Sequence, residues 1–273
     1  MTTQRPDAAP GRPPAQTPTA APPAHPPPEP LDDVALFLDV DGSLLDLRPV
    51  PEAVFAPLVV LRLLLHVQLR LDGALALVSG RTVDDLDRIF HPLRLPCAGV
   101  HGVERRDADG ILHRIAIDRA PLDAARPVLE RFAHGHPGAL VEDKGAALAL
   151  HTRRAPAATA AALALVEELA AASHGAFRAV AGKYVAELRP ATAHKGEALA
   201  AFMSEPRFAG RRPLMVGDDV TDGDAFREAR ARGGLAIAVG TGAPAADHWL
   251  DAPSSCRAWL ARATGFKRQW DLR

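Results

Sequence analysis

Two aspartates one residue apart follow a short apolar run near the start of the chain. Residues 34–38 have the pattern of a fully buried strand, and the run ends at Asp39. Asp39 and Asp41 repel each other, so their position indicates a cation between them or a substrate that uses them. The alternative is a plain turn, since Asp41-Gly42 is a favourable turn dipeptide. These residues alone leave both interpretations open.

Three more segments place polar residues at a predicted strand end or helix start. They are Ser79, Gly80 and Arg81 in "VSGR", Lys195 in "HKGEAL", and Asp218, Asp219 and Asp222 in "GDDVTD". In a doubly wound sheet, ligands bind outside the carboxyl ends of the strands. We therefore expect the four segments to converge on one crevice.

Carboxylates, a hydroxyl and an ammonium together indicate a site for phosphate and a divalent cation. Mg²⁺ prefers oxygen ligands, which Asp39, Asp218 and the backbone carbonyl of Asp41 can supply. Backbone N–H groups at a helix start, with Ser79 and Lys195, would hold the remaining phosphate oxygens. Asp39 could then attack phosphorus, and Asp41 could protonate the leaving oxygen and later activate water.

Each motif taken alone also has an ordinary structural interpretation. "SGR" is commonly a turn and helix cap, a lone lysine is commonly a surface charge, and "GDDVTDGDAF" could cap the helix that follows it. A calcium loop is disfavoured, because "DVDG" lacks the third ligand and the glutamate of an EF-hand. The order of the motifs, each at a strand end or helix start, favours a shared site.

Composition limits the classes of partner. The chain has 273 residues and a formal net charge of -1, which predicts no attraction to nucleic acid or to an anionic membrane. The longest apolar stretch is interrupted by Arg62, His66, Arg70 and Asp72, so we predict an amphipathic helix rather than a membrane span. Cys97 and Cys256 have the spacing of neither a zinc site nor a disulfide framework, which favours a cytoplasmic protein.

The order of predicted elements indicates an α/β fold, a doubly wound parallel sheet with an inserted α+β unit. Residues 33–110 and 190–273 alternate between strands and helices and would form the core. Residues 111–189 combine paired strand-like runs with Ala-rich helices and would form a cap domain. Residues 1–32, which contain 11 of the chain's 25 prolines, are predicted to be a disordered Pro/Ala-rich tail.

The four motifs "DVDGSL", "SGR", the lysine of "HKGEAL" and "GDDVTD" resemble, in order, those of the haloacid dehalogenase-like (HAD) phosphatases. Further stretches, "GVHGVE", "VEDKGAALALH", "GKYVAELRP" and "GDDVTDGDAF", resemble the trehalose-6-phosphate phosphatases of that superfamily. The resemblance covers nearly everything after residue 32. It implies a Rossmann-like core with a mobile cap over the site, and a Mg²⁺-dependent hydrolysis of trehalose 6-phosphate through an aspartyl phosphate.

The resemblance also implies roles for individual residues. Asp39 would be the nucleophile and Asp41 the general acid and base. Phosphate ligands would be Ser79, Gly80 and Lys195, and the metal site would comprise Asp39, Asp41, Asp218, Asp219 and Asp222. Substrate would be bound by Arg81, His101, Glu142, Lys144, Arg153 and Glu187.

Two positions depart from the family pattern, and two rival functions stay open. Ser43 replaces the usual threonine, and Gly223 replaces a commonly acidic residue near the metal. One rival is another HAD-type sugar-phosphate phosphatase or a phosphomutase. The other is a non-catalytic regulatory partner of a trehalose-phosphate synthase, and such a synthase is also the protein partner to consider for an active enzyme.

Overall fold

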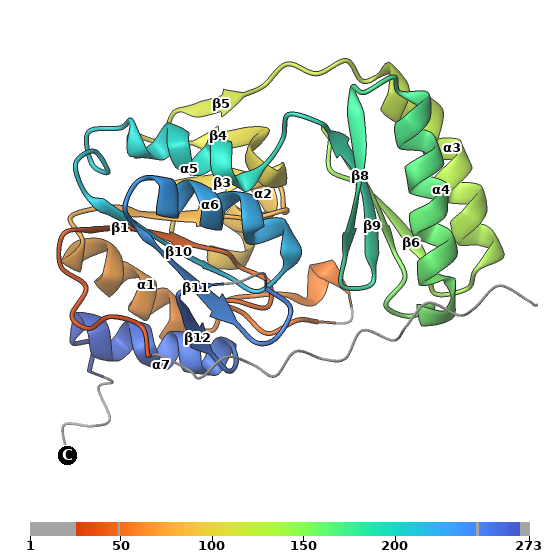
Figure 1. Cartoon of the computed structure of the whole chain (residues 1–273). Helices are drawn as coiled ribbons and strands as arrows, with labels where there is room; N and C mark the ends of the chain where they lie inside the picture. The colour runs from red at the N-terminus through yellow and green to blue at the C-terminus, as the bar shows by residue number, and fades with distance from the viewer. Residues whose placement is uncertain (1–25, 49, 244–245, 268–273) are drawn as a thin grey trace, which may run out of the picture.

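The chain forms two sheets, each with its own helices (Figure 1). This computed structural model describes residues 26–48, 50–243 and 246–267, to which all structural statements below refer. The large sheet has the strand order β12-β11-β10-β1-β2-β3-β4-β5 and the small sheet the order β6-β7-β9-β8. The separation into a large mainly parallel sheet and a small antiparallel one confirms the predicted fold class.

The strands of the large sheet come from both ends of the chain. They are β1 (Val34–Leu38), β2 (Leu75–Val78), β3 (Cys97–Gly99), β4 (Glu104–Arg106), β5 (Leu112–Arg114), β10 (Arg212–Gly217), β11 (Leu235–Val239) and β12 (His248–Leu250). The strands from β12 to β3 run parallel, and β4 and β5 add an antiparallel edge. We call this sheet and its helices the core.

Helices cover both faces of the large sheet. They are α1 (Leu58–Arg70), α2 (Val83–Phe90), α5 (Lys195–Met203), α6 (Gly223–Ala231) and α7 (Pro253–Thr264). Figure 1 shows α5 and α6 on one side of the sheet and α1 and α7 on the other. Short 3-10 helices lie at Pro51–Ala53, Val100–Gly102, Pro156–Ala158 and Val220–Asp222.

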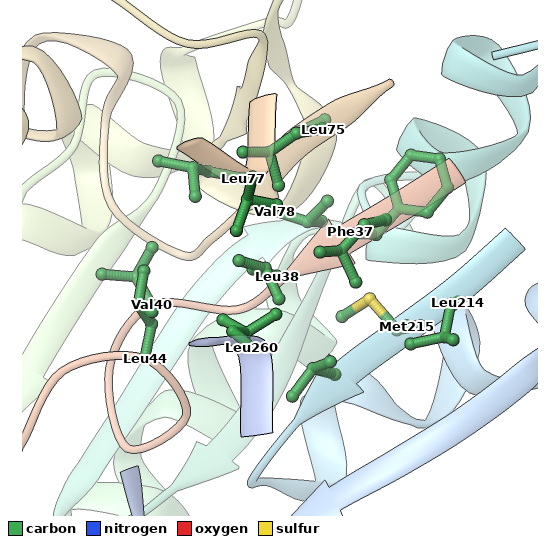
Figure 2. Close-up of a cluster of buried hydrophobic side chains, with 14 of the residues drawn as sticks. Phe37, Leu38, Val40, Leu44, Leu75, Leu77, Val78, Leu214, Met215 and Leu260 are labelled. Atoms are coloured by element: carbon green, nitrogen blue, oxygen red, sulfur yellow. The ribbon is translucent and has the colours of Figure 1, made fainter. Parts of the chain in front are cut away.

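Strand β1 lies at the centre of the core and is buried along its whole length. Successive strand residues point to opposite faces, so β1 contributes to the packing on both sides. Phe37 stacks on Phe208 and packs against Phe202 of α5, whereas Leu38 points toward Leu260 of α7 (Figure 2). Burial on both faces fixes the position of this strand and of the residue that follows it, Asp39.

The small sheet carries its helices on one face only, and we call the sheet and these helices the cap. Its strands are β6 (Leu140–Asp143), β7 (Leu148–His151), β8 (Phe177–Gly182) and β9 (Val185–Pro190), and its helices are α3 (Ala120–Gly135) and α4 (Thr159–Ala172). Figure 1 shows both helices on the side away from the core. The sheet's other face is therefore turned toward the core.

The cap has a separate hydrophobic cluster, which includes Leu129, Leu150, Val166 and Leu188. A third, smaller cluster of mostly small side chains joins core and cap residues; it contains Val100, Val103, Ala146, Ala147 and Ala193. The limits of the domains stay a prediction. Strand β5 pairs with the large sheet although it falls just inside the predicted insert.

The predicted tail needs a correction for residues 26–32. Leu31 is fully buried and its N–H donates to the carbonyl of Ala263 at 3.1 Å. Trp259 Nε1 donates to the carbonyl of Pro28 at 3.2 Å. These contacts pack the segment against α7, so it is not a disordered tail. Residues 1–25, the rest of the prediction, lie outside the described residues.

The amphipathic helix predicted for the longest apolar stretch is α1, which begins at Leu58 after Pro57 in an extended conformation. Within the described residues, no helix combines the length and the apolar character needed to cross a membrane.

Candidate active site

The carboxyl ends of three adjacent parallel strands build the crevice. Strand β1 lies between β2 and β10, and the residues that follow these three strands are Asp39, Ser79 and Asp218. Lys195 joins them as the first residue of α5. All four line one cavity, as their positions after strands and at a helix start predict.

Lys195 binds two carboxylates at the base of this crevice. Its Nζ lies 2.6 Å from Asp39 Oδ1 and 2.6 Å from Asp222 Oδ1, and only 3% of the lysine is exposed. Although burial alone would lower it, the two carboxylates raise the pKa of Lys195 above its ordinary value. The lysine is therefore held as a cation beside Asp39.

Asp222 lies behind the crevice rather than in its wall. It is fully buried, and its Oδ2 accepts the backbone N–H groups of Asp218 and Asp219 at 3.0 Å each. Asp219 and Asp222 form a capping box on the short helix 220–222. The capping predicted for "GDDVTDGDAF" is found only on this short helix, because Asp222 makes no side-chain capping hydrogen bond to α6, the longer helix that follows. Asp222 instead fixes Lys195 and the loop that carries Asp218.

Three carboxylates crowd one small volume. One oxygen each from Asp39, Asp218 and Asp222 lie within 4.8 Å of one another. Burial raises the pKa of Asp39 to about 7 despite the opposing effect of Lys195, and burial together with Asp39 raises the pKa of Asp218 to about 9. Each shift reflects the cost of ionising a buried carboxyl group beside other carboxylates, which a bound cation would lower.

The turn after Asp41 allows Asp218 to come close. Gly42 has a φ of +87°, and a Cβ there would lie 2.0 Å from Asp218 Oδ2. Ser43 Oγ donates to Asp39 Oδ2 at 3.0 Å and lies 3.4 Å from Asp218 Oδ1. Ser43, where the resemblance implies a threonine, therefore places a hydroxyl in contact with the carboxylates.

Asp41 is paired with Arg81. The guanidinium Nε lies 2.6 Å from Asp41 Oδ2 and Nη2 lies 2.9 Å from Oδ1, a bidentate arrangement. The backbone N–H of Arg81 donates to Ser79 Oγ at 3.2 Å. Helix α2 starts only at Val83, after the N-cap Thr82, so Ser79, Gly80 and Arg81 form a loop before the helix.

The cap places a row of side chains opposite this crevice. Strand register aligns Glu142 of β6 with Ala149 of β7, and Ala149 with Glu187 of β9. Residues in register share one face of a sheet, so the small Ala149 separates two carboxylates in one row. Both glutamates line the same cavity as Asp39.

Glu187 connects the cap with the core. Lys144 Nζ lies 2.8 Å from its Oε1, and Nε2 of His101, a core residue, lies 2.7 Å from its Oε2. Although burial alone would raise it, Lys144 and His101 hold the pKa of Glu187 well below its usual range. Burial lowers the pKa of His101 to about 4, so the imidazole is neutral at pH 7.

Sequence reasoning missed His151, which lines the cavity and lies 2.7 Å from Glu142 Oε2 through Nε2. The signal was the alternation in "ALALH", which puts His151 on the same face as Ala149. The predicted Arg153 lies at the cavity wall, where its guanidinium carbon is 5.5 Å from the centroid of the Tyr184 ring.

Of the predicted site residues, only Asp222 is not in the cavity wall. Those that line it are Asp39, Asp41, Ser79, Gly80, Arg81, His101, Glu142, Lys144, Arg153, Glu187, Lys195, Asp218 and Asp219. The core supplies carboxylates and a lysine suited to a phosphate and a cation. The cap supplies hydrogen-bonding side chains suited to the polar, uncharged portion of a ligand.

Comparison with known proteins gives matches over most of the chain. Residues 37–251 match the trehalose-phosphatase family. A probable trehalose-phosphate phosphatase of Sinorhizobium fredii is 44% identical over 225 residues, 82% of this chain and 84% of that protein. The trehalose-6-phosphate phosphatase of Escherichia coli is 39% identical over 230 residues, 84% of this chain and 86% of that protein.

A solved structure agrees with these matches at the level of the fold. It is the C-terminal domain of a trehalose-6-phosphate phosphatase from C. albicans, which aligns with a TM-score of 0.77 and 22% identity. The alignment covers 89% of this chain and 99% of that one.

Proposed function

The chain belongs to the trehalose-phosphatase family, and we propose that the crevice around Asp39 is where it hydrolyses trehalose 6-phosphate to trehalose and phosphate. The chain is accordingly a phosphatase acting on a sugar phosphate. The observation that carries the assignment is one cavity lined on the core side by Asp39, Lys195 and Asp218 and on the cap side by Glu142 and Glu187.

Asp39 is the nucleophile. A carboxylate oxygen forms the bond to phosphorus, the bond from phosphorus to the sugar oxygen breaks, and the aspartyl phosphate is then hydrolysed. Lys195, 2.6 Å from Asp39, holds the phosphate oxygens and favours the ionised form of the nucleophile. Ser79 and the backbone around Gly80 hold further phosphate oxygens from the other side of the crevice.

Asp41 is the general acid and base. In this state Arg81 clamps its carboxylate, so substrate must draw the guanidinium away before Asp41 can donate a proton to the leaving oxygen. The phosphate is the group that can do so, because a guanidinium binds phosphate as well as carboxylate. Arg81 then contacts the substrate, and Asp41 is free to activate water in the second step.

The crevice fits Mg²⁺. The donor set consists of carboxylate oxygens, and burial, together with the neighbouring carboxylates, raises the pKa values of Asp39 and Asp218, a cost of ionisation that a bound cation would offset. The two aspartates and the backbone carbonyl of Asp41 would hold the ion, with Asp219 and Asp222 supporting the surrounding loop. When bound, it withdraws negative charge from the phosphate oxygens.

The cap binds the sugar. Glu142, Lys144 and Glu187 present acceptors and a donor to sugar hydroxyls, with Arg153 and His101 at the edges of this row. A cytoplasmic location and a trehalose-phosphate synthase partner stay predictions from the sequence.

Measuring phosphate release from trehalose 6-phosphate, glucose 6-phosphate and sucrose 6-phosphate, with and without Mg²⁺, tests the function. We expect Mg²⁺-dependent release with trehalose 6-phosphate strongly preferred. Equal rates on all three esters would favour a general sugar-phosphate phosphatase, release of none would favour a regulatory protein, and transfer of phosphate to another sugar position would favour a phosphomutase.

A further inference from the structure

Arg189 is a buried cation on the face of β9 that also carries Glu187. Only 2% of it is exposed, and its Nε and Nη1 atoms find no hydrogen-bond partner within the described residues. Its register partner on β8 is another arginine, Arg178. Burial lowers the pKa of Arg189 to about 10. Buried donors without an acceptor destabilise a protein, so this side chain requires an explanation other than packing.

His101 presents the complementary problem. Its Nε2 lies 2.7 Å from Glu187, while its Nδ1 is buried without a partner in the described part of the chain. A neutral imidazole carries one proton. With that proton on Nε2, the ring donates to the Glu187 carboxylate and Nδ1 is left as an acceptor.

The unmatched atoms of Arg189 and His101 lie at the same boundary between core and cap, and Nε of Arg178 on the neighbouring strand β8 is buried without a partner among the described residues as well. Residues 187 and 189 point to the same side of β9, because strand residues alternate. The charge of Arg189 is near enough to His101 to lower the pKa of the imidazole. The guanidinium of Arg189, whose Nε and Nη1 lack an acceptor in the described part of the chain, thus lies on the same side of β9 as Glu187, whose partner His101 has an Nδ1 that lacks a donor.

We propose that Arg189 donates a hydrogen bond to Nδ1 of His101 through one water molecule, since no direct hydrogen bond joins these atoms within the described residues, and that it thereby positions Glu187 for the sugar. This hydrogen bond excludes the tautomer with the proton on Nδ1, in which a lone pair on Nε2 would face the Glu187 carboxylate. Arg189 is a positioning residue that acts through His101. The inference rests on the proposed function, because sugar binding by Glu187 is part of it.

Three variants test this role. Arg189→Met removes the charge and the donors, Arg189→Lys keeps a donor, and Arg178→Met is the matched control on the neighbouring strand. Nitrogen NMR of the imidazoles at pH 7 reports the tautomer of His101, and loss of a signal in His101→Gln identifies it among the 11 histidines. Steady-state kinetics on trehalose 6-phosphate and on a small aryl phosphate complete the comparison.

We expect Arg189→Met to shift the His101 signal toward a mixture of tautomers and to raise KM for trehalose 6-phosphate roughly tenfold, on the scale where 1.4 kcal/mol is a factor of ten. Its kcat and its activity on the aryl phosphate should change little. Arg189→Lys should restore most of both readouts, and Arg178→Met should resemble the wild type.

An unchanged His101 signal, equal losses on both substrates, or the same effect from Arg178→Met would overturn the inference. If Arg189→Met does not fold, Arg189→Gln supplies the uncharged comparison. If the wild type shows no preference for trehalose 6-phosphate over the aryl phosphate, the proposed function fails instead. The NMR signal of the Arg189 variants still decides whether Arg189 sets the tautomer.

Discussion

The crevice of the core and the facing side of the cap use charged side chains in opposite ways. In the crevice, Asp39, Asp218 and Asp222 gather around one lysine, and the pKa values of Asp39 and Asp218 are raised. In the cap, Glu187 is paired with Lys144 and with His101 of the core, and its pKa is lowered. The crevice therefore has more carboxylates than cationic side chains, whereas the carboxylate of Glu187 in the cap is paired with hydrogen-bond donors.

Under the proposed function, this difference assigns the chemical step to the crevice and sugar recognition to the cap. Excess negative charge creates a place for a cation and then for a phosphate, which every phosphate ester shares. Matched polar groups discriminate among ligands, because a wrong sugar leaves buried donors or acceptors unpaired. Changes in the crevice should therefore affect all substrates, and changes in the cap should affect sugar esters selectively.

The largest effect should come from Asp39→Asn, which we expect to reduce turnover of trehalose 6-phosphate and of an aryl phosphate alike by more than about a hundredfold. The amide cannot form the acyl phosphate. Single-turnover and steady-state assays measure the loss, and circular dichroism checks the fold. Asp46→Asn, an exposed aspartate outside this cavity, is the matched control. Retention of more than about a hundredth of the wild-type rate would contradict the covalent mechanism.

Removal of divalent cations should affect both substrates in the same way. EDTA should abolish activity and added Mg²⁺ should restore it, since in the proposed function Asp39 and Asp218 hold the cation between them. Asp218→Asn should raise the Mg²⁺ concentration for half-maximal activity by at least about tenfold, because it removes an oxygen ligand. Titrations of rate against free Mg²⁺ measure this. Full activity in EDTA would be incompatible with a metal site.

A change in the cap should separate the two substrates. Glu187→Gln should lower kcat/KM for trehalose 6-phosphate by roughly one to two orders of magnitude, because a hydrogen bond to a charged group contributes roughly 1.5 to 3 kcal/mol. Glutamine keeps the shape of the side chain beside Lys144, which alanine would not. An aryl phosphate that does not reach the cap should be hydrolysed nearly as before. Equal losses on both substrates would show that Glu187 acts on the chemical step or on the fold.

The position of the crevice residues could be predicted from the sequence, but the contacts between distant segments and the register of the cap strands could not. A residue that follows a buried parallel strand must lie at the carboxyl edge of the sheet, which fixed Asp39, Ser79 and Asp218. The pairing of Arg81 with Asp41 joins segments 40 positions apart and depends on tertiary packing. His151 was missed because the register between antiparallel cap strands is set by packing across the sheet.

The tail prediction shows a limit of composition. Residues 26–32 are at least as rich in proline as residues 1–25, so composition alone does not separate the two segments. The side chain of Leu31 is buried against the core, and this contact orders residues 26–32. Gly223, which replaces a commonly acidic residue, is a buried residue at the start of α6.

The excess charge in the crevice should also appear as a pH dependence of stability without Mg²⁺. The folded pKa values of Asp39 and Asp218, about 7 and about 9, lie above the 3.8 of the free groups. Between the unfolded pKa of 3.8 and the folded values of about 7 and about 9, the folded state binds more protons than the unfolded state. The free energy of unfolding therefore falls as the pH rises through this range. In EDTA, Tm should decline between about pH 5 and pH 9.

Thermal melts of Asp218→Asn should show a flatter decline, because one of the two groups no longer titrates, and Mg²⁺ should flatten the wild-type curve. Asp46→Asn should keep the wild-type slope. A Tm that rises across this window in EDTA would rule out the charge excess.

The smallest effect should come from removing residues 1–25, which should change neither Tm nor kcat/KM for either substrate. This stretch is rich in proline and alanine and has few large apolar side chains that could add to a core. Removing residues 1–32 should instead lower Tm by several degrees, because Leu31 is fully buried and Trp259 loses the acceptor at Pro28. Neither truncation should change the ratio of the two substrates' kcat/KM, since the lost contacts are with α7, away from crevice and cap. Thermal melts and parallel assays of both truncations check this, and a selective loss on trehalose 6-phosphate after removal of residues 1–25 would mean that sugar recognition extends beyond the cap.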